Sequence, residues 1–417
     1  VGNTQFKPKE KVTRAEVADY IHTISTQITT PTQTIQIIQI PSSGNSDNTF
    51  ANNDKFKILL DVWNRIHEKY VGKEKLDDKK LLYGAISGMV NKLGDKYTVF
   101  QEPATAKNFS ESLTGEFDGI GVSIDLIENK VRIISPIQGT PASKAGLKSK
   151  DIILEIDKKS TAGLTLPEVS ALIKGPTGTK VELLIERDGK KISFSITRER
   201  IRLDAIVAKM KGKVAYIIVR NFTQSSGLDF AVQAKKLLEK NPTSFVIDLR
   251  DNPGGYLDAS LQMLDTFLPK KTRLASLKFS KRENAEEFLR TSVGGAERAE
   301  IDAIDPEVIF YSIGEGELAN YPIKVLINGG SASASEIVAA SLKENNHATL
   351  IGEKSFGKGT VQEIADYNDG SLYKQTIAKW QTPNEKNLTE NPIVPDIEIK
   401  DDPKTDEDEA LEYALKH

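Results

Sequence analysis

A serine at a predicted strand-to-helix junction is the side chain best suited to nucleophilic chemistry in this sequence. Residues 323–344 read IKVLINGGSASASEIVAASLKE, with a strand predicted to end at Asn328 and a helix to begin near Ala334. Ser333 lies at the junction, where the free N–H groups of a helix start converge. The amide of Ala334 would point at the oxyanion formed when Ser333 attacks a carbonyl. Ser333 and Glu336 also have capping-box spacing, so a purely structural role stays open.

A lysine 25 residues further along could act as the base for this serine. Lys358 lies between two glycines in GEKSFGKGTVQ, and Gln362 follows four residues later. That spacing puts both side chains on one face of a helix or a strand. Burial can lower the pKa of a lysine enough for it to accept a proton, and a neutral glutamine could orient the amine. A surface lysine in a glycine-rich turn, with no catalytic role, would also fit this sequence.

Two glycine-rich turns could bind parts of a substrate. SFVIDLRDNPGGYL predicts a buried strand followed by a turn, and the amide of Gly254 or Gly255 could be a second oxyanion donor. An ordinary Asn-Pro-Gly turn would look the same. In FDGIGVSI, the run Gly119, Ile120, Gly121 and Val122 precedes a predicted strand. Such a loop could hold a terminal carboxylate while the strand edge accepts an extended peptide.

Composition excludes several other classes of chemistry. The 417 residues contain no Cys and four His, which removes thiol nucleophiles and leaves little for a zinc enzyme. The formal net charge is -3, so we expect no nucleic-acid partner. No metal or cofactor is needed for the serine and lysine chemistry.

The elements needed to position these residues follow from periodicity. Apolar residues recur at helical spacing between 55 and 100. Short β runs broken by Gly and Pro fill 113–197, with one helix at TLPEVSALIK. From 201 onward, strands and helices alternate, which is typical of an α/β domain.

These motifs together resemble the C-terminal processing peptidases, or tail-specific proteases. LGDKYTVF, GTPASKAGLKSKDIILEID, VIDLRDNPGGYLD, NGGSASASEI and GEKSFGKGTVQ occur in the family's order between Leu59 and Asp396. The resemblance implies a multidomain α+β protein: an α/β crotonase-like protease core with an inserted β-rich PDZ domain and an N-terminal helical segment. The predicted domains are 55–104 (N-terminal helices), 105–200 (PDZ) and 201–400 (protease core), followed by an acidic C-terminal tail at 401–417.

The resemblance also implies roles for individual residues. Ser333 would be the nucleophile, Lys358 the base and Gln362 its support. The oxyanion hole would use Ala334 and the Gly254–Gly255 turn, without deciding which glycine donates. The loop from Gly119 to Val122 would bind the C-terminal end of a protein or peptide substrate, and the module would gate the active site.

The sequence departs from the family at several points. Lys174 stands where members often carry the Arg that links PDZ to core, so the coupling is expected to differ. The stretch 280–316 is longer and more charged than usual, and NLTENPIVPDIEI lacks the usual glycine. A catalytically silent PDZ scaffold is therefore the alternative. A trypsin-like PDZ protease lacks its histidine and G-N-S-G-G contexts here, and a crotonase-type acyl-CoA enzyme would not explain a PDZ module.

The N-terminal region suggests a location and two partners. Residues 1–24 resemble the closing half of a surface-layer homology repeat, with Thr13 as a helix cap, and 25–54 are predicted to be a linker. This partial repeat, the family and a chain that begins at Val1 predict an extracytoplasmic, secreted or envelope-associated protein of a Gram-positive bacterium. Cell-wall polymer is a possible partner. The resemblance further implies a homodimer through the N-terminal helices.

Overall fold

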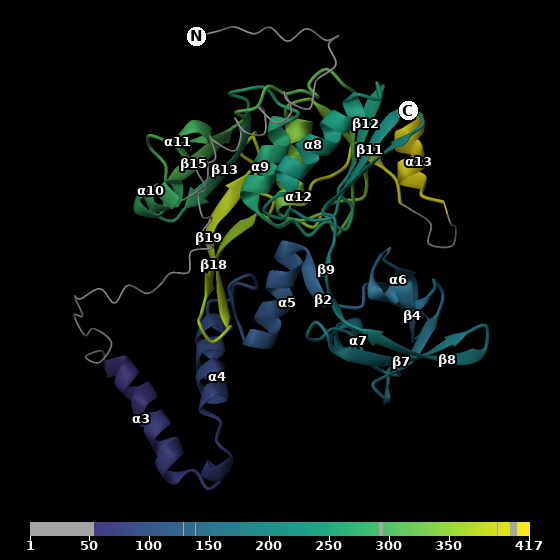
Figure 1. Cartoon of the computed structure of the whole chain (residues 1–417). Helices are drawn as coiled ribbons and strands as arrows, with labels where there is room; N and C mark the ends of the chain where they lie inside the picture. The colour runs from purple at the N-terminus through teal and green to yellow at the C-terminus, as the bar shows by residue number, and fades with distance from the viewer. Residues whose placement is uncertain (1–53, 128, 138, 292–294, 390, 401–406) are drawn as a thin grey trace, which may run out of the picture.

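The computed structural model describes residues 54–127, 129–137, 139–291, 295–389, 391–400 and 407–417. The predicted cell-wall segment, with Thr13, and nearly all of the predicted linker lie outside these ranges. Figure 1 shows three parts: N-terminal helices, a small β-rich module and a larger α/β core. Within the described residues, no helix is both long enough and apolar enough to cross a bilayer.

The N-terminal part is a pair of helices, α3 (Asp54–Lys69) and α4 (Asp78–Asn91), joined through the short helix η1 (Lys73–Lys75). Asp77 caps α4 by accepting a hydrogen bond from the Lys80 amide at 3.1 Å. Figure 1 shows α3 projecting away from the rest of the chain. The exposed apolar side chains of the two helices include Ile58, Leu59, Leu60, Val62, Leu82 and Met89.

A long hairpin connects these helices to the core. Strands β18 (Thr360–Asp366) and β19 (Leu372–Gln381) pair antiparallel, and Figure 1 shows the hairpin reaching down to α4. Strand β1 (Val99–Gln101) pairs with β19, so the end of the predicted N-terminal region belongs to a core sheet. This strand lies just before the boundary predicted at residue 104, and periodicity cannot report which strand such a short segment will join.

The β-rich module is built on one antiparallel sheet of order β3-β4-β5-β7-β8, with β6 (Lys159–Ser160) paired to β5. Its strands are β3 (Val122–Ile127), β4 (Lys130–Pro136), β5 (Ile152–Ile156), β7 (Lys180–Arg187) and β8 (Lys190–Thr197). Helices α6 (Pro141–Ala145) and α7 (Leu166–Ile173) complete its own apolar core, which includes Ile133, Val169 and Leu183. Strand β3 ends this sheet, so among the described residues one of its edges is not paired to another strand.

The chain enters and leaves this module through two paired strands. After α5 (Pro103–Thr114), strand β2 (Glu116–Gly119) pairs antiparallel with β9 (Glu199–Arg202). The predicted PDZ range of 105–200 thus begins inside α5, and the module's own sheet starts at Val122. The module has its own apolar core, and the chain joins it to the rest of the protein at these two adjacent strands.

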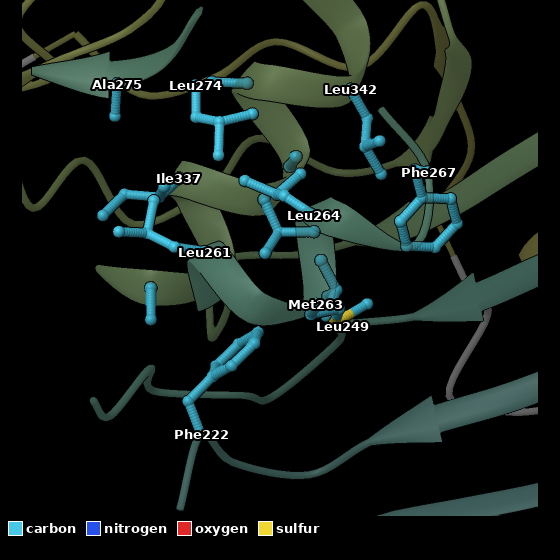
Figure 2. Close-up of a cluster of buried hydrophobic side chains, with 14 of the residues drawn as sticks. Phe222, Leu249, Leu261, Met263, Leu264, Phe267, Leu274, Ala275, Ile337 and Leu342 are labelled. Carbon is cyan, nitrogen blue, oxygen red and sulfur yellow. The ribbon is translucent and has the colours of Figure 1, made fainter. Parts of the chain in front are cut away.

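The core contains a sheet of order β10-β11-β12-β16-β17-β20 that is parallel from β11 onward. Its strands are β10 (Ile206–Lys211), β11 (Val214–Val219), β12 (Ser244–Asp248), β16 (Ile323–Ile327), β17 (Ala348–Gly352) and β20 (Ile397–Glu398). Alternate side chains point to opposite faces. One face packs on α8 (Ser226–Leu238), α9 (Leu257–Asp265) and α12 (Ala334–Glu344), and Figure 2 shows Leu261 and Leu264 in the same buried cluster as Ile337.

The C-terminal segment packs against the opposite face of this sheet. Helix α13 (Glu409–Lys416) buries Ala410, Leu411 and Ala414 in a cluster with residues of β11, β12, β16 and β17. The sequence predicts an acidic C-terminal tail at 401–417. Within its described part, the apolar residues of LEYALK recur at helical spacing and cover a sheet face.

The described parts of the charged stretch 280–316, which leave out 292–294, are also folded. They form α10 (Arg282–Thr291), α11 (Gly295–Arg298), β14 (Ala299–Ile301) and β15 (Glu307–Tyr311). These strands extend the second core sheet, of order β1-β19-β13-β15-β14, in which β13 spans Arg273–Phe279 and β18 pairs with β19.

The contact between α4 and the hairpin tip gives a test of the fold. Tyr83 Oη donates to Asp369 Oδ2 at 2.5 Å, and hydrogen bonds from Ser371 and Tyr83 lower the pKa of Asp369 to about 2. We expect Tyr83→Phe to reduce the free energy of unfolding by about 1 kcal/mol in urea titrations at pH 7. A carboxyl with a lowered folded pKa loses its stabilising effect as the pH falls below about 4 towards 2. The difference between wild type and variant should therefore shrink in acid, and a constant difference would contradict the assignment.

Candidate active site

Ser333 occupies a strained turn between β16 and α12. Its φ of 55° and ψ of -115° are unusual for a residue with a side chain. The turn is held by Ser331, whose Oγ donates to the Leu249 carbonyl at 2.8 Å and accepts from the Asn328 amide at 3.0 Å. A strand therefore delivers the serine to the start of a helix, as the sequence predicts. Ser333 is partly exposed, while its neighbours Ala332 and Ala334 are buried.

The carboxylate of Glu336 joins the serine segment to the lysine segment. Glu336 is fully buried in the first turn of α12. Its oxygens accept four hydrogen bonds, from Ser333 N at 2.8 Å, Ser355 Oγ at 2.6 Å, Gly357 N at 2.7 Å and Lys358 N at 2.9 Å. Bonds from neutral donors to an ionised acceptor are among the stronger ones in proteins. Ser333 and Lys358 are thus both tied by their backbones to one carboxylate.

The backbone around Lys358 is held from its other side by the hairpin. Trp380 is fully buried, and its Nε1 donates to the Lys358 carbonyl at 2.7 Å. Asn387 Nδ2 donates to the Gly359 carbonyl at 2.9 Å. A Cβ at Gly359 would lie 2.5 Å from the Thr389 amide, so only glycine fits against this loop.

The surroundings of Lys358 favour its neutral form. Burial of the ammonium, reinforced by the positive charge of Lys374, lowers the pKa of Lys358 to about 8, although Glu336 acts in the opposite direction. Nζ of Lys358 lies 5.5 Å from the centre of the Tyr97 ring. Lys374, on β19, is itself held 4.9 Å from the ring centre of Phe109. A large fraction of Lys358 is therefore able to accept a proton at mildly alkaline pH.

Gln362 bonds to threonines. Its Nε2 donates to Thr360 Oγ1 at 2.8 Å and to Thr376 Oγ1 at 3.3 Å. The predicted shared face with Lys358 assumed one continuous element. Lys358 instead precedes β18, and the pairing register shifts between Val361 and Gln362. A bulge of this kind re-aims a side chain, which four-residue spacing cannot report.

The turn after β12 packs directly against the serine. Asn252 is fully buried, and its Nδ2 donates to the Val219 carbonyl at 2.8 Å while its Oδ1 accepts from the Gly254 amide at 2.9 Å. A Cβ on Gly254 would be 2.8 Å from the Cβ of Ser333. Because the Gly254 amide is already bonded to Asn252, the amides of Gly255 and Ala334 are the better candidates for an oxyanion hole.

The loop from Gly119 to Val122 leads into the unpaired edge of β3. Ile120 is fully buried, and its carbonyl accepts from the Ala142 amide at 2.7 Å. Gly121 has a φ of 77°, and its carbonyl accepts from the Ile137 amide at 2.9 Å. Both carbonyls are thus bonded within the module, and the left-handed backbone conformation of Gly121 lets the loop turn sharply before an edge strand. The neighbouring helix is α7, so an extended peptide added to β3 would lie beside α7.

Lys174 contacts the segment that precedes the module. It ends α7, and its Nζ donates to Glu111 Oε2 on α5 at 3.0 Å, with the ring of Phe117 5.3 Å away. These three residues line a cavity of about 330 Å³ that also touches Pro253, the residue before Gly254. The lysine predicted to couple module and core thus bonds to α5, and it lines the same cavity as Pro253, the residue before the Gly254–Gly255 turn.

Several residues with clear roles in this geometry escaped sequence reasoning. Glu336 was visible only as a capping residue, although its position three after Ser333 was the available signal. Asn252 lies in the predicted Asn-Pro-Gly turn and Tyr97 in the LGDKYTVF motif, but neither side chain was given a role. Trp380 and Lys374 gave no signal, because each meets the site through long-range packing.

Comparisons with known proteins agree with this architecture. Residues 213–399 match Peptidase family S41, residues 132–187 match the PDZ domain, and residues 18–105 match the activating protease CtpB N-terminal domain. The chain is 37% identical to the carboxy-terminal processing protease CtpB of Bacillus subtilis over 88% of this chain and 72% of that protein. It is 32% identical to CtpA of the same organism over 83% and 69%. A solved photosystem II D1 C-terminal processing protease aligns with 85% of this chain and 89% of its own, at 24% identity and a TM-score of 0.49.

Removing the charge of Glu336 should disable the site. The amide of Glu336→Gln would present N–H groups to backbone N–H donors, so we expect proteolytic activity to fall about 100-fold. The free energy of unfolding should also fall by about 3 kcal/mol, as measured in denaturant. Glu344→Gln is the matched control, since Glu344 lies in the last turn of the same helix and accepts one hydrogen bond, from the Asn384 amide. Equal activity of the two variants would show that Glu336 has no role at the site.

The influence of Lys374 on Lys358 can be read from a pH profile. A neutral base is needed for attack, so activity should rise with pH through about 8. Lys374→Gln removes a neighbouring positive charge, which should raise the pKa of Lys358 and move the alkaline midpoint to higher pH. Lys379→Gln, an exposed lysine of the same strand, should leave the midpoint unchanged. A downward or absent shift in Lys374→Gln would refute this coupling.

Proposed function

Because the chain belongs to the carboxy-terminal processing proteases of peptidase family S41, which are serine peptidases, we propose that it cleaves protein tails with Ser333 as nucleophile and Lys358 as general base. The observation that carries this proposal is the buried Glu336 carboxylate, which bonds to the backbones of both residues. The lowered pKa of Lys358 supports the role of base. The strained backbone of Ser333 supports the role of nucleophile.

The proposed reaction has two halves. Neutral Lys358 Nζ accepts the proton of Ser333 Oγ as the oxygen attacks the scissile carbonyl carbon. The amides of Ala334 and Gly255 stabilise the oxyanion of the tetrahedral intermediate. Protonated Lys358 then gives its proton to the leaving amine, and the C–N bond breaks to leave an ester on Ser333. In the second half, Lys358 takes a proton from water, whose oxygen attacks the ester carbonyl carbon. The C–O bond to Ser333 then breaks, Lys358 returns the proton to Ser333 Oγ, and the acyl group leaves as a carboxylic acid.

Gln362 and the tail-binding loop have supporting parts in this proposal. Gln362 is bonded to Thr376, whose amide donates to Thr98 Oγ1 at 3.0 Å. Thr376 therefore links Gln362 on the hairpin to the LGDKYT segment. The loop from Gly119 to Val122 would receive the C-terminal carboxylate of a substrate, and β3 would pair with the residues before it. Lys174, bonded to Glu111, would relay tail binding to the core.

We further propose a homodimer and an extracytoplasmic location. The exposed apolar side chains of α3 and α4 support a homodimer through these helices. The relatives that match are bacterial, and an extracytoplasmic site stays a prediction. Cell-wall binding rests on residues outside the described ranges.

The decisive experiment pairs catalytic variants with two matched substrates. An unstructured polypeptide with a free C-terminal carboxylate should be cut by the wild type, and the same chain with an amidated C-terminus should be cut more slowly. Ser333→Ala and Lys358→Ala should abolish cleavage of both while binding of the free-tailed polypeptide persists. Full cleavage by either folded variant would refute the assignment. Binding without any cleavage by the wild type would favour the silent scaffold.

A further inference from the structure

The C-terminal helix α13 is linked to the segment that leads into the Gly254–Gly255 turn by a partly buried set of charged side chains, Asp408, Arg250 and Asp248. Arg250 Nη1 and Nη2 donate to the two oxygens of Asp408, each at 2.8 Å. The same guanidinium donates from Nε and Nη2 to Asp248, at 3.0 and 2.7 Å. Arg250 exposes 15% of its side chain and Asp248 7%, so water screens this arrangement only weakly. Two bidentate contacts on one guanidinium leave it little freedom to move.

The position of Asp408 is set by helix α13. Its Oδ1 also accepts the Leu411 amide at 2.9 Å and so caps the helix. The helix is anchored by Leu411 and Ala414 against the sheet. At the other end of the charge chain, Tyr216 Oη donates to Asp248 Oδ2 at 2.7 Å. Through Arg250, Asp408 therefore links helix α13, which packs on one face of the sheet, to Asp248 at the end of β12.

Arg250 opens the turn that packs on the nucleophile. The next residue, Asp251, donates its amide to Asn328 Oδ1 at 2.9 Å and has a φ of 58°. Four residues after Arg250, Gly254 meets Ser333 with no room for even a methyl group. A turn packed this closely cannot shift without displacing either the serine or the amide of Gly255.

We propose that Asp408 is a positioning residue for proteolysis: by holding Arg250 from α13, it keeps the Gly254–Gly255 turn aligned with Ser333. The inference rests on the proposed function, because it assumes that this turn stabilises the oxyanion. Asp408 touches no reacting atom, and its effect is on the transition state. Substrate tails bind elsewhere, at the β-rich module, so the KM for a tailed polypeptide should be independent of Asp408.

The test uses the full chain with Asp408→Asn, which keeps the shape and the helix cap but loses the charge. We expect kcat on a free-tailed polypeptide to fall about tenfold, which corresponds to about 1.4 kcal/mol, with KM unchanged. The rate at which an alkyl fluorophosphonate labels Ser333 should fall in parallel, since that reaction needs the same oxyanion hole. Asp408→Glu, which keeps the charge, should recover part of both rates.

Two controls separate positioning from stability. Glu412→Gln removes an exposed α13 charge paired with Lys416 at 3.2 Å and should leave kcat and labelling unchanged. Leu237→Ala opens a cavity in α8 and serves as the variant with a lowered Tm. The proposal is overturned if Asp408→Asn keeps wild-type kcat, or if Leu237→Ala, assayed at the same margin below its Tm, loses kcat equally. Retained activity in Ser333→Ala would instead overturn the proposed function, so the two failures are distinguishable.

Discussion

The buried carboxylate of Glu336 is the constraint on which the candidate site depends. An ionised group without contact to water must be compensated, and here four donors from two separate segments do so. The serine turn and the lysine loop follow different strands of the parallel sheet. Their meeting is specific because any other arrangement would leave this charge partly unpaired. Together with the two hydrogen bonds of Ser331, the same bonds hold the strained backbone of Ser333 in place.

The β-rich module is a separate unit that two paired strands attach to the core. Its core is complete without the rest of the chain, and only the paired strands β2 and β9 lead into and out of it. Lys174 and Glu111 form an ion pair next to these strands, beside a cavity that reaches Pro253. A module joined in this way can change its orientation at low cost. Lys358, by contrast, is held by the hairpin through the hydrogen bond from Trp380 to its carbonyl.

The surroundings of Lys358 lower the pKa of its amine. Desolvation and the neighbouring charge of Lys374 act together, and the aromatic ring of Tyr97 fills space that water would otherwise occupy. A chain without cysteine and with only four histidines has few other bases to offer. The hairpin β18–β19 supplies Gln362, Lys374 and Trp380 from one continuous element. One hairpin thus supports the proposed base and also contacts the N-terminal helices.

Local patterns in the sequence determined much of this protein: the strand-to-helix junction at Ser333, the turn at Gly254, the β-rich module and the alternation of the core. Each depends on residues adjacent in the chain, where periodicity and glycine placement act directly. The family is likewise readable from ordered motifs. Tertiary structure alone decided that β1 joins the core sheet, that α13 covers a sheet face and that a bulge turns Gln362 towards Thr376. It also decided that Glu336 binds both Ser333 and Lys358. These outcomes depend on which distant groups share one buried space, and the energies that select them arise only when the chain has packed and water has left.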